Sequence, residues 1–155
     1  MNSITTFQEI RRDGKVIEES MTPEDMIRAG WQPDKVVALR WVWYDRTIEL
    51  RSPFGFLSRV VPSREYVAVL EDTDAGGQHA VLTVYQTDGS PRGTFRNVLE
   101  IAGKPAAGEF RSFRTPKSPL PTAFCVLFDV FSNGGTYQVD IDAASGAVLG
   151  MQEVH

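Results

Sequence analysis

The residues best suited to nucleophilic or metal chemistry are few in this sequence, and they are far apart. It has one cysteine, Cys125, and two histidines, His79 and His155. Neither histidine has a second histidine or a cysteine at zinc-ligand spacing, so no metal site and no cofactor are expected. Cys125 with His79 as its base would make a nucleophilic pair. The apolar run 124–128 around the cysteine instead favours a thiol packed in the core.

Carboxylates supply the other candidate chemistry. The segments Asp72-Thr73-Asp74 and Asp140-Ile141-Asp142 each place two aspartates two residues apart, before a glycine-containing turn. An EF-hand loop needs a further oxygen ligand at position five and a glutamate at position twelve, and neither segment supplies them. Aspartates that form turns at strand ends explain both segments. Since the glycines fall between strands and form no phosphate-binding loop, the sequence predicts a protein that is not an enzyme.

Charge is segregated along the chain. Residues 35–64 and 92–117 each carry a net charge of +4, whereas residues 65–91 and 118–155 contain acids and no lysine or arginine. Either acidic and basic strands lie side by side and neutralise one another, or the acids gather on one face that docks a basic partner. The acidic face predicted on the second interpretation consists of Glu71, Asp72, Asp74, Asp129, Asp140 and Asp142.

Local signals near the N-terminus predict the elements that open the fold. Asp13-Gly14 fits the type I′ turn of a hairpin between strands at 4–12 and 15–19. Thr22 can cap a short helix over 23–29, whose first turn is acidic. Gly30 supplies the left-handed residue that ends this helix. Met26 and Ile27 are its expected contacts with the core.

From residue 35 onward the apolar period is two, which indicates strands. The strands at 36–44 and 122–131 are the most apolar, and both are expected at the centre of a sheet. Within the first, the alternation that includes Trp41 and Trp43 favours a core role for these side chains over an interface role. Further strands are predicted at 47–51, 66–71, 80–87, 94–101, 109–114, 136–141 and 148–154, with Asn133-Gly134 as the strongest hairpin turn. The fold class that follows is mainly β (α+β): an antiparallel meander of about 8–10 strands, sandwich- or barrel-like, with one short N-terminal helix.

Length and composition fit a single globular domain over residues 1–155. The chain is 42% hydrophobic and 23% charged. The first residues lack the pattern of a secretory leader, and no apolar stretch approaches the roughly 20 residues of a membrane helix. With one cysteine, which fits a reducing compartment, these features predict a cytoplasmic protein without membrane contact. The net charge of −4 disfavours direct nucleic-acid binding.

Three segments together resemble a known class of protein. They are the helix opener Met21-Thr22-Pro23-Glu24-Asp25, the aromatic strand 40–44 and the closing hairpin 137–146. Their layout is similar to that of immunity proteins from bacterial polymorphic or contact-dependent toxin systems. The resemblance implies a protein that neutralises a cognate toxin, expected to be a basic nuclease, by covering its active site with the acidic face. These immunity proteins share no diagnostic motif, so no residue role is transferred.

Two other functions stay open at this stage. Inward aromatic side chains can line the cavity of a β-barrel that binds a small molecule or a lipid. An enzyme that uses carboxylates or arginines in an arrangement not visible in the sequence is the second alternative.

Overall fold

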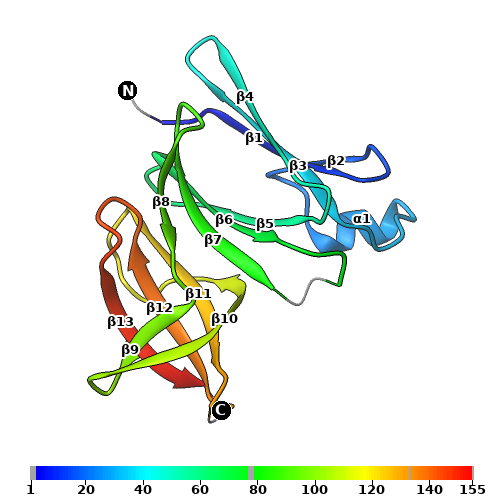
Figure 1. Ribbon diagram of the computed structural model, residues 1–155. Coiled ribbons are helices and arrows are strands. Elements are labelled where there is room, and N and C mark those ends of the chain that lie inside the picture. Colours follow the sequence, from blue (N-terminus) through cyan, green and yellow to red (C-terminus); the bar gives the residue numbers. More distant parts are fainter. Residues whose placement is uncertain (1–2, 77–78, 133, 155) are drawn as a thin grey trace.

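The computed structural model describes residues 3–76, 79–132 and 134–154, which form thirteen strands and one short helix (Figure 1). All strand pairings are antiparallel, and they make three sheets with the orders β2-β1-β3-β4, β5-β6-β7-β8 and β13-β12-β11-β10-β9. The mainly β fold class is therefore confirmed. The elements are β1 (Thr6–Arg11), β2 (Val16–Glu18), α1 (Pro23–Arg28), β3 (Val36–Trp43), β4 (Arg46–Arg51), β5 (Phe56–Val60), β6 (Tyr66–Asp72), β7 (Ala80–Gln86), β8 (Pro91–Phe95), β9 (Val98–Ile101), β10 (Lys104–Arg114), β11 (Ala123–Val130), β12 (Thr136–Asp142) and β13 (Val148–Val154).

The N-terminal hairpin and helix form where their local signals predict. The turn between β1 and β2 is not the expected type I′, because Gly14 has φ +86° but Asp13 does not have a positive φ. The Thr22 side chain accepts a hydrogen bond from the Asp25 amide, and the Asp25 carboxylate accepts one from the Thr22 amide, so the capping box is complete. The expected core contact of Ile27 is wrong, because this side chain is 75% exposed and only Met26 is half-buried. A helix of six residues presents too narrow a face to bury both.

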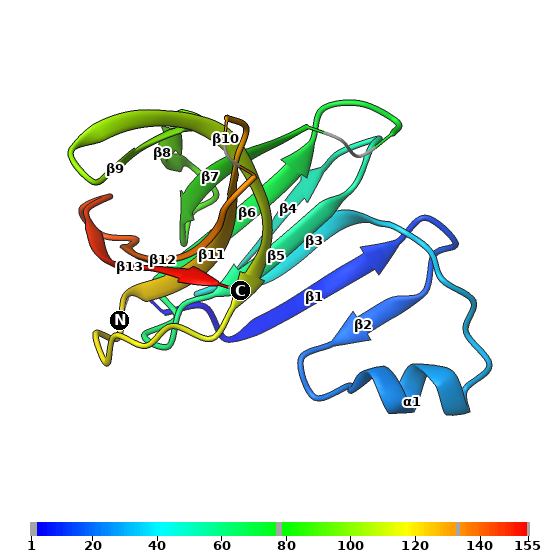
Figure 2. The ribbon, with the colours of Figure 1, turned by 90° about the horizontal axis from the view of Figure 1, so that it is seen from below.

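The middle sheet, β5 to β8, lies between the other two and is covered on both faces (Figures 1 and 2). Strand β6 shows how: Val67 and Val69 pack against the N-terminal sheet, whereas Ala68 and Leu70 pack against the C-terminal sheet. Neighbouring residues of a strand point to opposite faces. A strand that packs against a core on each face therefore buries consecutive residues, as β6 does over 67–70. The C-terminal sheet curves strongly around its own side of the middle sheet (Figure 2).

Both strands expected at a sheet centre lie there. Strand β11 is the middle strand of the five-stranded sheet, and β3 is flanked by β1 and β4. Trp41 of β3 is fully buried, and its indole N–H donates to the carbonyl oxygen of Thr87 at 2.8 Å. This bond ties the N-terminal sheet to the end of β7. Trp43, two residues on, is half-buried.

Between residues 94 and 108 the chain departs from the sequence-based expectation. The single strand expected at 94–101 is two strands, β8 and β9, which belong to different sheets. The stretch between the strands expected at 94–101 and 109–114 is the first half of β10, and the turn before it is Ala102-Gly103, where both residues have positive φ. Strand β5 was not expected either, and the thirteen strands exceed the expected number of about 8–10. Asn133 lies outside the described residues, but β11 and β12 on either side of it pair as a hairpin.

Candidate functional site

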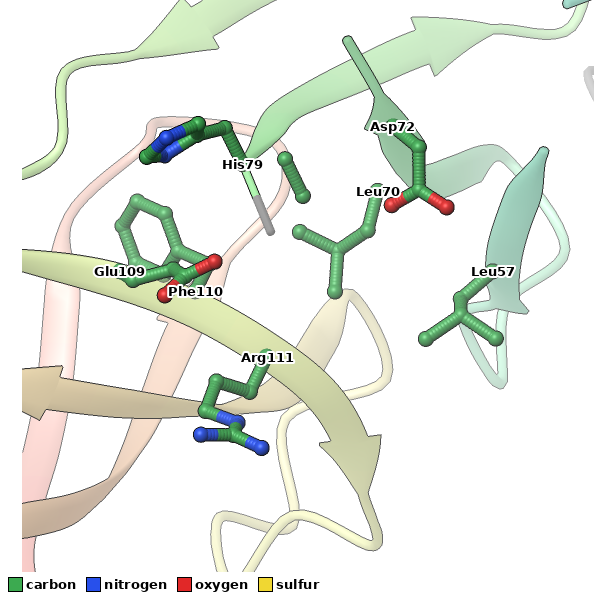
Figure 3. A pocket seen from close by; sticks show the side chains of 8 residues that line it. Leu57, Leu70, Asp72, His79, Glu109, Phe110 and Arg111 are labelled. Carbon is green, nitrogen blue, oxygen red and sulfur yellow. The ribbon is translucent and has the colours of Figure 1, made fainter. Parts of the chain in front are cut away.

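A cleft of about 440 Å³ opens between the middle sheet and β10 (Figure 3). Its apolar floor comes from both sides, with Leu70 and Ala80 on the middle sheet and Phe110 on β10. Leu57 of β5 stands at its edge with 48% of its surface exposed. The ionisable side chains around this floor are Asp72, His79, Glu109 and Arg111.

The strand geometry explains why acidic groups from distant parts of the chain meet here. Asp72 ends β6 on the same face as Leu70, and its amide is held by the carbonyl oxygen of Gly55 at 3.0 Å. Glu109 sits on β10, beside Phe110. Figure 3 shows Asp72 and Glu109 on opposite sides of Leu70. The cleft therefore places one carboxylate on each wall and an apolar surface between them.

Ion pairs neutralise part of this charge. The Asp72 carboxylate lies 3.5 Å from the Lys35 ammonium, and Arg111 bonds to Asp129 at 2.8 Å. Across residues 3–76, 79–132 and 134–154, the carboxylate of Glu109 has no such partner, although Glu109 stands directly opposite Asp129 in the sheet. Three carboxylates against one lysine and one arginine leave the cleft with an excess of one negative charge.

The structure does not bring the six carboxylates of the predicted acidic face to one place. Glu71 and Asp72 are neighbours on β6, so they point to opposite faces. Glu71 faces the N-terminal sheet, where burial chiefly, and the Glu71 charge in addition, raise the pKa of Tyr85. Asp74 lies in the segment after β6. Asp72 alone of these three lines the cleft.

The other three predicted carboxylates share one face of the C-terminal sheet, as the pairing of β11 with β12 requires. All three accept hydrogen bonds from within the protein, and Asp129 accepts them from Arg111 and from the Thr136 hydroxyl. Asp140 is 8% exposed and accepts hydrogen bonds from the amides of Lys117 and Ser118 at 2.9 and 2.8 Å. Asp142 accepts bonds from the turn after β12 and from Thr122, and the Thr122 bond is the main reason that its pKa lies below the usual value. That these six residues bind a partner stays a prediction.

Glu109 and Arg111 are the site residues that sequence reasoning missed. Both fall within residues 92–117, whose net charge of +4 does not indicate an acidic site. Glu109 and Arg111 reach the cleft because β10 passes close to the middle sheet. No local sequence pattern predicts a contact between strands so distant in sequence. The one available hint was the acid at 109 within an alternating strand.

The described side chains are not arranged for the nucleophilic or metal chemistry considered from the sequence. Cys125 is buried in β11 opposite Asp140, and burial is the main cause that raises the pKa of its thiol to about 11. His79 is exposed at the rim of the cleft. Among the residues that the structure describes, no group of three His, Cys, Asp or Glu side chains is placed to hold a metal ion. His155 lies outside those residues.

The aromatic side chains expected to line a barrel cavity pack against one another instead. The ring centroids of Phe110 and Phe128 are 5.0 Å apart, and those of Phe113 and Phe124 are 6.1 Å apart. Phe110, Phe124 and Phe128 are at most 1% exposed.

In the described part of the chain, no helix has the length and apolar character needed to traverse a bilayer.

Comparison with known proteins defines the class to which this fold belongs. Over nearly its whole length the chain matches a protein whose structure was solved together with another protein, and it belongs to the family of that protein. That solved structure is described as Tne2 in complex with Tni2. The sequences are 34% identical, the match covers 98% of this chain and 99% of that one, and the TM-score is 0.93. No protein-family model matches the chain, and neither does any curated protein.

Proposed function

We propose that this chain is an immunity protein, which binds one cognate toxin and thereby blocks its activity. The observation that carries the proposal is the full-length match to one partner of the Tne2–Tni2 complex, which we interpret as a toxin and its immunity protein. The absence of a metal-ligand group from the described residues and the burial of Cys125 are compatible with a binding role. The resemblance noted in the sequence points to the same class.

The cleft is our candidate for the central contact. Stable protein interfaces bury about 1,200–2,000 Å² in total and concentrate their energy in a few recessed positions. The cleft offers an apolar floor with exposed Leu57 beside it, and on its wall stands Glu109, which forms no ion pair with any residue that the structure describes. A basic side chain of the toxin would pair with Glu109 while an apolar one covers Leu57. The toxin's active site would thus be covered by this face.

The nature of the toxin is a separate part of the proposal. An acidic inhibitor suits an enzyme with a basic cleft, and on this ground the sequence favours a nuclease. Incubating the purified partner with DNA and RNA, alone and with this chain, tests that prediction. We also propose that the protein acts in the cytoplasm, where a toxin from a neighbouring cell would arrive and a buried, unpaired Cys125 stays reduced.

The test of the immunity function is co-expression with the product of the neighbouring gene in a host that this product poisons. Growth restored by the wild-type chain, together with co-purification of the two proteins, is the expected result. Continued poisoning despite soluble expression of the chain would overturn the proposal.

The test of the cleft uses the double substitution Asp72→Asn, Glu109→Gln, with Glu100→Gln on the exposed edge of β9 as the matched control. We expect the double variant to bind the toxin at least about tenfold more weakly, because each charged contact in an interface contributes about 1.5–3 kcal/mol. The control should bind as the wild type does. Equal binding by both variants would place the interface elsewhere while leaving the immunity function intact.

A further inference from the structure

A second recess, which we call the groove, is separate from the cleft and lies where β1, β2, α1 and β5 meet. It has a volume of about 380 Å³. Its apolar lining consists of Phe7, Ile17, Met21, Met26 and Val60. Met21 and Met26 are both half-buried. Methionine side chains are flexible and polarisable, so walls made of them adapt to the shape of an inserted group.

Glu9 of β1 places a carboxylate in this groove. The side chain is half-buried and, among the described residues, accepts one hydrogen bond, from the Ser58 hydroxyl at 3.3 Å. Burial raises the pKa of Glu9, while the Ser58 bond and the charge of Arg59 act in the opposite direction. Within the described residues no ion pair joins Glu9 to Arg59. The carboxylate therefore keeps most of its capacity to accept hydrogen bonds.

Three of the other charged side chains of the groove are engaged by neighbours, whereas Arg59, which also lines the groove, forms no ion pair within the described residues. Arg64 holds both carboxylate oxygens of Glu19, at 2.8 and 3.0 Å, and also donates to the backbone at Ile4. Glu18 accepts a bond from Gln8 at 2.7 Å. An incoming cation would therefore meet the Glu9 carboxylate without first breaking one of these pairs.

We infer that this groove binds an arginine side chain presented by a protein partner, with its guanidinium on Glu9. The aliphatic stem of an arginine would lie along Met21 and Met26, and the planar head would reach the carboxylate beside Ser58. Arginine suits a half-buried carboxylate better than lysine does, because guanidinium is more weakly hydrated and donates in a fixed fork. This site lies apart from the cleft, and the inference does not depend on the immunity function.

The methionines supply a direct test by NMR. The chain has four, of which Met21 and Met26 line the groove and Met151 lies in the C-terminal sheet as an internal reference. N-acetyl-arginine methylamide is titrated into the protein labelled at its methionine methyl groups. A probe of this size is expected to bind in the millimolar range. We expect saturable shifts for Met21 and Met26 and none for Met151.

Three comparisons make the result specific. N-acetyl-citrulline methylamide, which has the same shape without the charge, should bind at least about tenfold more weakly. Glu9→Gln should abolish the preference for arginine over citrulline, whereas Glu24→Gln on the exposed start of α1 should preserve it. N-acetyl-lysine methylamide should bind more weakly than the arginine probe. An arginine probe that moves no groove methionine, or that binds the Glu9→Gln variant equally well, would overturn the inference.

Discussion

At the scale of single residues, carboxylates of similar appearance in the sequence do different work. The buried carboxylate of Asp140 holds two backbone amides of the segment after β10, so its loss removes two charge-assisted hydrogen bonds. Asp129 pairs with Arg111 at the surface, where ion pairs contribute little. We expect Asp140→Ala to lower the free energy of unfolding by about 2–4 kcal/mol. Asp129→Ala should cost about 1 kcal/mol or less. Urea unfolding of the two variants measures the difference, and equal losses would contradict this assignment.

Glu9 gives stability an unusual dependence on pH. Its pKa in the folded protein lies above the ordinary value of 4.5, so the folded state binds this proton more tightly than the unfolded state does. The contribution of Glu9 therefore becomes more favourable as pH falls through the raised pKa toward 4.5, and it is least favourable at neutral pH. Glu9→Gln should be more stable than the wild type at pH 7.5, and its advantage should shrink as the pH falls to 5. Urea unfolding of both proteins across this range is the measurement, with Glu24→Gln as the control.

At the scale of elements, β10 depends on a glycine at the point where it leaves β9 for β11. A Cβ at Gly108 would lie 2.2 Å from the carbonyl oxygen of Asp129 and 2.6 Å from the Phe128 ring. Gly150 in β13 has no atom within 4 Å of the same position. Gly108→Ala should therefore destabilise the protein by about 1–3 kcal/mol or more, as overpacking does. Gly150→Ala should be neutral or stabilising by up to about 1 kcal/mol. Thermal unfolding of both variants tests this, and a tolerated Gly108→Ala would show that β10 can shift away from β11.

Elements with local causes could be predicted from the sequence, and those set by distant contacts could not. The hairpin at Asp13-Gly14, the capping box of α1 and the central place of β11 each follow from residues within one segment. The division between β8 and β9 does not, because it depends on which sheet each segment joins. The same limit applies to the site: Asp72 was found by its charge, but Glu109 enters only through the course of β10 in space.

At the scale of the whole molecule, the middle sheet joins two hydrophobic clusters that would otherwise be independent. Leu82 is fully buried in the cluster shared with the C-terminal sheet, whereas the three tryptophans lie in the N-terminal part of the chain. We expect Leu82→Ala to lower the unfolding free energy by about 2–5 kcal/mol. Tryptophan fluorescence and far-UV circular dichroism should report the same shifted transition. A fluorescence transition that stays at the wild-type midpoint would mean that the two clusters unfold separately.

Strand β5 pairs with β6 along one side only and contributes neighbouring residues to both recesses: Leu57 to the cleft and Ser58 to the groove. A ligand that shifts this strand at one recess therefore changes the shape of the other. Thermodynamic linkage makes such an effect reciprocal, so a partner protein bound at the cleft would alter the affinity for arginine by the same factor as arginine alters the affinity for that partner. One edge strand would then make two binding events interdependent.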